Sequence, residues 1–248
     1  MVALAGLTGA VAGSFLNVLI HRLPRGESLV RPRSRCPGCM APIAPYDNVP
    51  VLSWLLLRGR CRGCGRGISA RYPAVELLTA VTFLAVVLAR GPSAELAVEL
   101  PFAAMLIAVA AIDLQHRIVP NRIVGPAALY GVAASAVVRT SELPELLIAG
   151  AAAFTFLLLA ALVYPAGMGM GDVKLAGVMG LYLGVSVVPA LLAAFLAGSV
   201  VGVALIARHG GAARKRGIPF APFLALGGIV ALLAGPELVD LYAARFLS

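Results

Sequence analysis

Apolar residues run along this chain in long stretches separated by short polar segments, and they do not alternate with polar residues. Windows of about 16 to 20 such residues predict membrane-spanning helices. The windows cover residues 2–20, 74–89, 96–112, 123–138, 146–164, 173–187, 189–207 and 218–236. The fourth and sixth windows are short or interrupted, and the sixth can merge with its successor. We therefore expect about eight spans, within a range of six to eight.

Composition supports a membrane setting for the whole chain. Of its 248 residues, 60% are hydrophobic and 12% are charged, and the mean hydropathy is +0.95. A chain of this kind cannot bury its apolar surface against itself in water. The predicted fold class is an all-α polytopic membrane protein with one small polar insert between the first two helices.

The positive charges indicate an orientation. The formal net charge is +9, and half of the twenty Lys and Arg residues lie between the first two windows: Arg22, Arg25, Arg31, Arg33, Arg35, Arg58, Arg60, Arg62, Arg66 and Arg71. Loops rich in Lys and Arg stay in the cytosol. Alternating the spans from there leaves only Arg90, Arg139 and Arg245 outside and places residues 214–216 inside. We expect an inner (cytoplasmic) membrane protein with its amino terminus outside and its insert in the cytosol.

The insert contains all four cysteines of the chain. They form two Cys-x2-Cys pairs, Cys36 with Cys39 and Cys61 with Cys64. Four thiolates at this spacing complete a closed tetrahedral shell for a structural zinc ion. Two disulfides or four idle thiols are the alternatives, which a reducing compartment disfavours. The sequence therefore predicts structural Zn²⁺ that helps to fold the insert.

A basic zinc module also suggests nucleic acid as a partner. The insert shows no recognition helix and no aromatic stacking platform, and its arginines flank predicted spans. Anionic lipid headgroups account for such charges more simply. We expect membrane lipids, and no nucleic acid, as partners of this surface.

Two aspartates stand at the cytosolic ends of predicted spans. Asp113 ends an apolar run, and Asp172 follows Gly169-Met170-Gly171. Each has an ordinary explanation by itself, because Asp172 could cap the next helix and Asp113 could be solvated or paired with Arg117. Together they lie on the same side of the membrane on different helices, where carboxylates are costly without a function.

An aspartyl dyad is the chemistry that these residues favour. Two adjacent carboxylates share one proton, so one can activate a water molecule while the other polarises the scissile carbonyl. Gly169 and Gly171 would let the backbone approach an extended peptide. Lys174 could hold its helix end at the interface or act on Asp172. Glu76 could favour its helix dipole or contact a substrate amine.

Ordered motifs along nearly the whole chain resemble the type IV prepilin peptidases, a family of membrane aspartyl proteases of the Gly-x-Gly-Asp class. Apart from the cysteine pairs and the two aspartates, the motifs are Gly13-Ser14-Phe15-Leu16-Asn17-Val18, Arg22-Leu23-Pro24, Asn48-x-Pro50, Ser53-Trp54, Leu57-Arg58-Gly59, Tyr72-Pro73-x-x-Glu76, Pro120, Gly169 to Lys174 and Ile218-Pro219-Phe220-x-Pro222-Phe223-Leu224-Ala225. The chain departs from the family pattern at Asn121, where aspartate is frequent, and at Ala221, where glycine is frequent.

The resemblance implies cleavage of the basic leader from type IV prepilins or pseudopilins at the cytosolic face, with Asp113 and Asp172 as the catalytic pair. Members with the long cysteine-bearing insert commonly also methylate the new amino terminus with S-adenosylmethionine. No motif in this chain independently indicates a methyl-donor site. The implied division is a first helix at 1–20, a zinc-binding insert at 21–73 that serves methyl transfer, and a protease core at 74–248.

Two other classes remain as alternatives. A proton- or ion-coupled transporter would also use intramembrane acids and broken helices, but it would carry them at mid-membrane within repeated halves. No repeat is evident in this sequence. A structural anchor with a zinc module would leave both aspartates dispensable.

Overall fold

The computed structural model describes residues 2–165, 167–209 and 218–246, and its regular structure there is helical. The chain divides into two compact units, Met1–Pro92 and Ser93–Ser248. The basic residues predicted inside at 214–216 lie outside the described residues.

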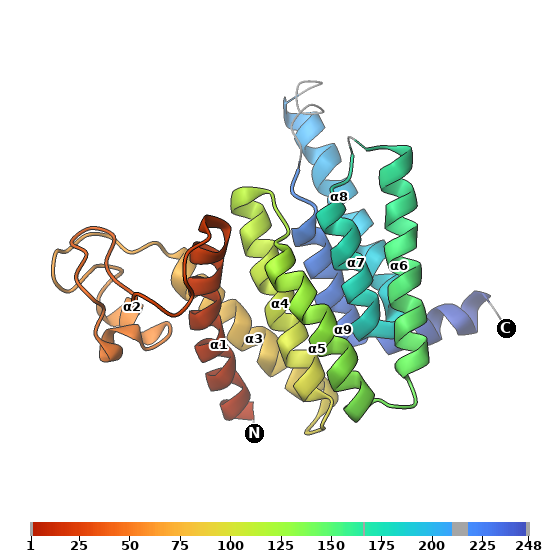
Figure 1. Ribbon diagram of the computed structural model, residues 1–248, viewed down its shortest axis with the longest axis horizontal. Helices are drawn as coiled ribbons and strands as arrows, with labels where there is room; N and C mark the ends of the chain where they lie inside the picture. Colours follow the sequence, from red (N-terminus) through yellow and green to blue (C-terminus); the bar gives the residue numbers. More distant parts are fainter. Residues whose placement is uncertain (1, 166, 210–217, 247–248) are drawn as a thin grey trace. The chain divides into compact units, whose positions relative to one another are not determined.

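The first unit consists of two long helices and the insert between them (Figure 1). Helix α1 spans Val2–Arg22 and α3 spans Arg71–Arg90. The insert contains the short helix α2 at Leu52–Leu56 and the 3-10 turns η1 at Leu23–Arg25 and η2 at Pro45–Asn48.

Small residues allow α1 and α3 to pack closely. A Cβ atom added at Gly9 would lie 2.7 Å from the Cα of Ala80, and one at Gly13 would lie 2.6 Å from the Cα of Glu76. Such small-residue faces let backbones approach in a membrane, where association depends on close van der Waals packing. A hydrogen bond also joins the two helices, since the side-chain amide of Asn17 donates to the carbonyl of Tyr72 at 2.9 Å.

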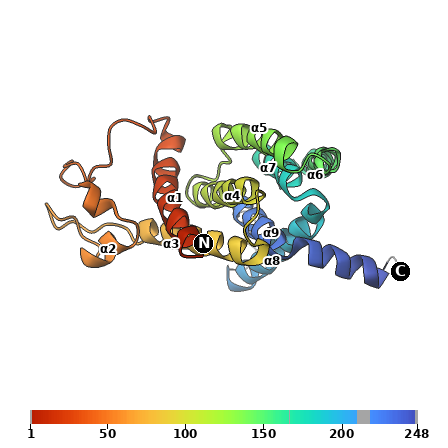
Figure 2. The same ribbon diagram turned by 90° about the horizontal axis from the view of Figure 1, so that it is seen from below.

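The second unit is a helical bundle. Its helices are α4 at Leu96–His116, α5 at Asn121–Val138, α6 at Leu143–Val163, α7 at Met170–Leu183, α8 at Val187–His209 and α9 at Ala221–Phe246. The turn η3 at Gly184–Ser186 joins α7 to α8. Figure 2 shows α4 beside α5 and α9, and α4 also contacts α7.

Helix α4 supplies much of the buried core of this unit. Phe102, Leu106, Val109 and Ile112 are fully buried, as expected for a helix with neighbours on several sides. Phe102 stacks on Tyr182 of α7 with ring centroids 4.5 Å apart. This packing fixes α7 against α4, and each of these two helices carries one of the predicted aspartates.

The structure confirms the predicted class, since the part of the chain that it describes contains seven runs long and apolar enough to span a membrane. Residues 170–208 form one such run because η3 joins α7 to α8. The final helix is longer than the predicted window at 218–236: it begins at Ala221, bends at Ala234 and continues to Phe246. Pro236 lies next to the bend, and proline disrupts the hydrogen bonding of the turn before it.

Candidate active site and metal centre

Asp113 lies in the last turn of α4, where its side chain is buried. Its Oδ2 accepts a hydrogen bond from the backbone N–H of Ala221, the first residue of α9, at 3.2 Å. The first N–H groups of a helix have no partner within the helix and carry partial positive charge. The N-terminus of α9 would therefore stabilise a negative charge on the Asp113 carboxylate.

Asp172 lies in the first turn of α7 and is also buried. The N-cap residue of this helix is Gly169, so Asp172 is not the N-cap. Its carboxylate instead interacts with the backbone N–H of Gly169, as the third helical residue does in a capping box. An acidic side chain here also complements the helix dipole.

The fold brings the two aspartates together. They are 59 positions apart in the sequence, but α4 contacts α7, and the Asp113 carboxylate is close enough to act electrostatically on Asp172. Both are shielded from solvent at 5% and 9% exposure. When two buried carboxylates interact electrostatically, ionising both costs more than ionising one, which favours a single negative charge on the pair.

The packing of α6 on α7 sets the depth of Asp172. Cβ atoms added at Gly177, Gly180 and Gly184 would meet Phe154, Ala149 and Glu145 of α6. This antiparallel register places Asp172 opposite the region of Leu159, four residues before α6 ends at Val163. At a rise of about 1.5 Å per residue, the aspartate is recessed about 6 Å below that end of α6.

The two glycines before Asp172 have different surroundings. A Cβ at Gly171 would lie 2.7 Å from the Cβ of Val119, in the segment between α4 and α5. A Cβ at Gly169 would meet only ordinary contacts, with Asp172 Oδ2 at 3.6 Å, and its φ of −81° suits any residue. Gly171 is thus required for packing, while the surroundings of Gly169 would accept a Cβ atom at ordinary contact distance from the carboxylate.

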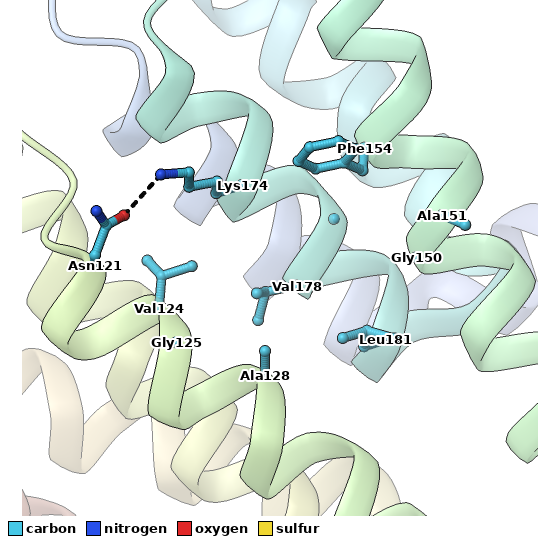
Figure 3. Close-up of a pocket in the computed structure, with 11 residues that line it drawn as sticks. Asn121, Val124, Gly125, Ala128, Gly150, Ala151, Phe154, Lys174, Val178 and Leu181 are labelled. Atoms are coloured by element: carbon cyan, nitrogen blue, oxygen red, sulfur yellow. Dashed lines mark hydrogen bonds between the residues drawn. The ribbon is translucent and has the colours of Figure 1, made fainter.

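Lys174 lies on the opposite face of α7 from Asp172, since two residues turn a helix by about 200°. Its Nζ donates to Oδ1 of Asn121 at 3.1 Å. Both residues line a groove of about 490 Å³ formed by α5, α6 and α7, which Phe154 and Val178 also line (Figure 3). The groove is not at the aspartate pair, and no contact in the described residues joins Lys174 to that pair.

Glu76 belongs to the first unit, in α3. Its Oε2 accepts the backbone N–H of Val51 at 2.7 Å, and Ser14 of α1 also hydrogen-bonds to it. Val51 has a φ of 59°, which a β-branched residue rarely adopts. Glu76 therefore ties the insert to both long helices of its unit.

The four cysteines meet as predicted. Their sulfur atoms all lie within 4.8 Å of one another, with Cys36 and Cys64 at 3.7 Å and Cys39 and Cys61 at 4.0 Å. No disulfide links them. Four sulfurs at about 2.3 Å from a tetrahedral ion would lie about 3.8 Å apart, so the cluster has the dimensions to hold a metal ion.

Each knuckle has the same backbone. Cys36 N–H donates to the carbonyl of Ala41 and Cys61 N–H to that of Arg66, at 2.9 and 2.8 Å. The residue after the second cysteine has a positive φ in both knuckles, 58° at Met40 and 69° at Gly65. The two knuckles therefore present their thiols in matching orientations.

The electrostatics of the cluster also favour a cation. Backbone N–H groups of Cys39 and Gly38 lower the pKa of the Cys36 thiol to about 6. At Cys64, the backbone N–H of Arg66 lowers the pKa, but burial and the neighbouring thiols together raise it to about 11. Four close thiols cannot all ionise by themselves, and a divalent ion would stabilise all four thiolates.

Comparisons with known proteins bear on both units. Residues 7–90 match the model of the bacterial peptidase A24 N-terminal domain, and residues 100–206 match that of the type IV leader peptidase family. The chain is 36% identical to the prepilin leader peptidase/N-methyltransferase of Bacillus subtilis (strain 168), over 98% of each chain. It is 36% identical to the protein of that name from Aeromonas hydrophila, over 99% of this chain and 94% of the relative.

The chain belongs to the type IV leader peptidase family. The resemblance found in the motifs is thereby confirmed, and membership in a peptidase family favours the protease interpretation over the transporter. A similar protein of Myxococcus xanthus (strain DK1622) is 40% identical over 82% of this chain and 62% of its own length. No solved structure matches the chain.

Sequence reasoning assigned no role to two residues that contact the segments carrying the aspartates, Ala221 and Val119. Ala221 stands in the matched motif 218–225, but it acts through its backbone N–H, which any residue except proline provides. Val119 precedes Pro120 and fills the space that Gly171 leaves. The motif at residues 218–225 could have drawn attention to Ala221 from the sequence, whereas Val119 is identified only by its packing against Gly171.

Proposed function

We propose that this chain is a prepilin leader peptidase in which Asp113 and Asp172 form the catalytic pair. The observation that carries the proposal is a pair of buried, electrostatically coupled carboxylates held by two different helices of the second unit. Family membership and the names of its relatives, prepilin leader peptidase/N-methyltransferase, support the reaction class.

The two carboxyl groups take different parts in the reaction. The N-terminus of α9 complements a negative charge on Asp113, so we assign it the ionised form and Asp172 the protonated form. The oxygen of a water molecule bonds to the scissile carbonyl carbon while Asp113 accepts a proton from that water. Asp172 donates its proton to the carbonyl oxygen at the same time, so that a tetrahedral diol forms.

The second half of the reaction returns the protons. The tetrahedral diol collapses as its C–N bond breaks, the departing nitrogen takes a proton from Asp113, and Asp172 recovers one from a diol hydroxyl. The products are the leader with a new carboxyl end and the mature protein with a free amine. No covalent acyl intermediate forms, since neither carboxylate bonds to the substrate.

The substrate class is a prepilin or pseudopilin with a basic leader before a hydrophobic segment. The insert is itself basic, so attraction between the leader and the insert does not explain recruitment. Of the acids near the cytosolic face, Asp47 is already bound by Arg62 at 2.7 Å, which lowers the Asp47 pKa. We infer that the hydrophobic segment delivers the substrate laterally through the membrane. The exposed Glu27 and the ionised member of the dyad then supply local negative charge, since Glu76 is held by the Val51 N–H.

Charge reversal of the substrate leader tests this route. Lateral delivery predicts that turnover falls while partitioning of the substrate into the membrane is retained. A large loss of membrane partitioning with turnover intact would contradict it.

The metal of the Cys36, Cys39, Cys61 and Cys64 cluster is proposed to be structural Zn²⁺. Four sulfur ligands are typical of zinc and leave no open coordination position for chemistry. The cluster would fix the insert, residues 21–73, whose helical content in the structure is small.

We further propose that the insert serves methylation of the amine which cleavage releases. S-adenosylmethionine would supply the methyl group, and the names of the relatives support this second activity. The protease chemistry belongs to the helices that follow the insert, within residues 74–248.

The insert and the aspartate pair are proposed to face the cytosol, with the amino terminus outside. The proposal rests on the ten arginines within residues 21–73, because loops rich in Arg and Lys stay in the cytosol. Seven candidate spans among the described residues, together with family membership, support a multi-pass protein of the inner membrane.

The test is cleavage of a prepilin-like peptide by the protein in lipid nanodiscs, with products identified by mass. The wild type should release the leader, and Asp113→Asn and Asp172→Asn should each reduce the rate by about 10²–10⁴-fold. Labelled S-adenosylmethionine in the same reaction separates cleavage from methylation. Retained cleavage in both variants would overturn the assignment of the dyad.

A further inference from the structure

Helix α2 of the insert presents its apolar side chains outward. Leu52, Leu55 and Leu56 are spaced i, i+3 and i+4, which places them on one face of a helix. They are 54%, 58% and 74% exposed in the whole chain. Three leucines on one exposed face form a continuous patch, unlike the single exposed apolar residues common on protein surfaces.

The inner face of α2 is fixed by specific contacts, so the leucines cannot rotate inward. Ser53 is buried, and its hydroxyl donates to the carbonyl of Tyr46 at 2.8 Å. The indole N–H of Trp54 donates to the carbonyl of Ile68 at 3.0 Å. A Cβ at Gly59 would lie 2.8 Å from the Trp54 ring. The folded structure of the insert therefore holds the leucine face outward.

Positive charge follows this face in the sequence. Arg58 and Arg60 come shortly after the end of α2 at Leu56 and are exposed. Residues 21–73 contain ten arginines against two acids, Glu27 and Asp47, and Asp47 is paired with Arg62. Exposed leucines next to arginines are typical of segments that lie in the interface of an anionic membrane.

We propose that the face of Leu52, Leu55 and Leu56 docks into the headgroup region of an anionic lipid bilayer, with Arg58 and Arg60 on lipid phosphates. The insert is joined at both ends to helices of membrane-spanning length, α1 and α3, so a bilayer surface lies within reach of this small segment. The positive charge matches anionic lipid. Docking would hold the cysteine cluster at the membrane surface independently of catalysis.

The single tryptophan of the chain is a local probe for this contact. Trp54 lies within α2, between Leu52 and Leu55 in the sequence and on the inner face of the helix, so quenching of its fluorescence by lipid reports that α2 lies close to the bilayer. The protein is placed in nanodiscs of anionic phospholipid brominated on the acyl chains near the headgroup. We expect quenching of Trp54 relative to unbrominated lipid.

Two sets of variants make the measurement specific. Leu52→Ser combined with Leu56→Ser should reduce the quenching by about twofold or more, since these side chains insert. Arg58→Gln with Arg60→Gln should reduce it in anionic lipid and leave no difference between anionic and zwitterionic lipid. Val30→Ser is the matched control, because Val30 is 80% exposed on the same insert but lies outside α2, and its quenching should be unchanged.

Metal content and cleavage are measured on every variant to confirm that the insert is folded. Equal quenching in the leucine variants and the wild type would overturn the proposal. So would quenching that is absent in brominated lipid while Trp54 emission shifts with protein concentration, because the face would then contact a second copy of the chain.

Discussion

The backbone N–H of Ala221 donates a hydrogen bond to Oδ2 of Asp113, 108 positions away in the sequence, at 3.2 Å. The contact joins the start of α9 to the last turn of α4. It gives the matched motif at 218–225 a physical role, since the motif directs a helix N-terminus at the proposed base.

Ala221→Pro should remove this donor while keeping the helix. Ala221 is the first residue of α9, the position at which proline is best tolerated in a helix. A hydrogen bond to a charged group is worth about 1.5–3 kcal/mol, so we expect cleavage to slow by about 10–100-fold. The measurement is single-turnover cleavage, with the thermal midpoint recorded for both proteins.

Ala221→Gly is the control, because it keeps the N–H and introduces the residue that is frequent in the family. Its cleavage rate should match that of the wild type. A proline variant with the wild-type rate and midpoint would show that the contact has no part in the reaction.

Gly171→Ala should displace the first turn of α7. Its added Cβ would lie 2.7 Å from the Cβ of Val119, whereas Gly169→Ala meets only ordinary contacts. A displacement of about 1 Å near a reacting group can cost about 10²-fold in rate, so we expect this loss at Gly171 and less than about threefold at Gly169. Cleavage assays of both variants check it. If Gly169→Ala is the more damaging change, a close approach of substrate to its backbone is the better explanation.

Glu76→Ala should loosen the insert. It removes the acceptor of the Val51 N–H, and an unsatisfied buried donor costs about 1–3 kcal/mol. We expect faster proteolysis between α1 and α3. Glu76→Gln retains an acceptor oxygen and should behave like the wild type in the same assay. Loss of cleavage in Glu76→Gln with normal protease resistance would instead indicate that the charge binds substrate.

The structural environment of the aspartates could be predicted only in part from the sequence. Apolar windows located the helices because burial in lipid requires continuous apolar runs, and the cysteine spacing located the metal cluster. The register of α6 on α7, which recesses Asp172, depends on contacts of Gly177, Gly180 and Gly184 that no local pattern reveals. The sequence also grouped Lys174 with the site, and only the geometry shows that it lines a separate groove. The last helix continues past the bend at Ala234 to Phe246, which is beyond the end that the apolar window predicted.

Met40→Gly should tighten metal binding by the insert. Met40 has a φ of 58° where the other knuckle has Gly65 at 69°. Holding a non-glycine residue in this conformation costs about 1–3 kcal/mol, so relief should strengthen binding by about fivefold or more. Competition with a chromophoric chelator measures this. Gly65→Ala should change the affinity in the opposite direction, and equal affinities in all three proteins would count against matched knuckles.

The most direct measurement of the central claim is a double-mutant cycle on the two aspartates. Single-turnover cleavage of a prepilin-like peptide is compared for the wild type, Asp113→Asn, Asp172→Asn and the double variant, all in nanodiscs. Because the two carboxyls act as one unit, each single substitution should lower the rate by about 10²–10⁴-fold and the double variant should lose little more. Losses that multiply in the double variant, or a single variant that cleaves at the wild-type rate, would contradict a shared-proton dyad.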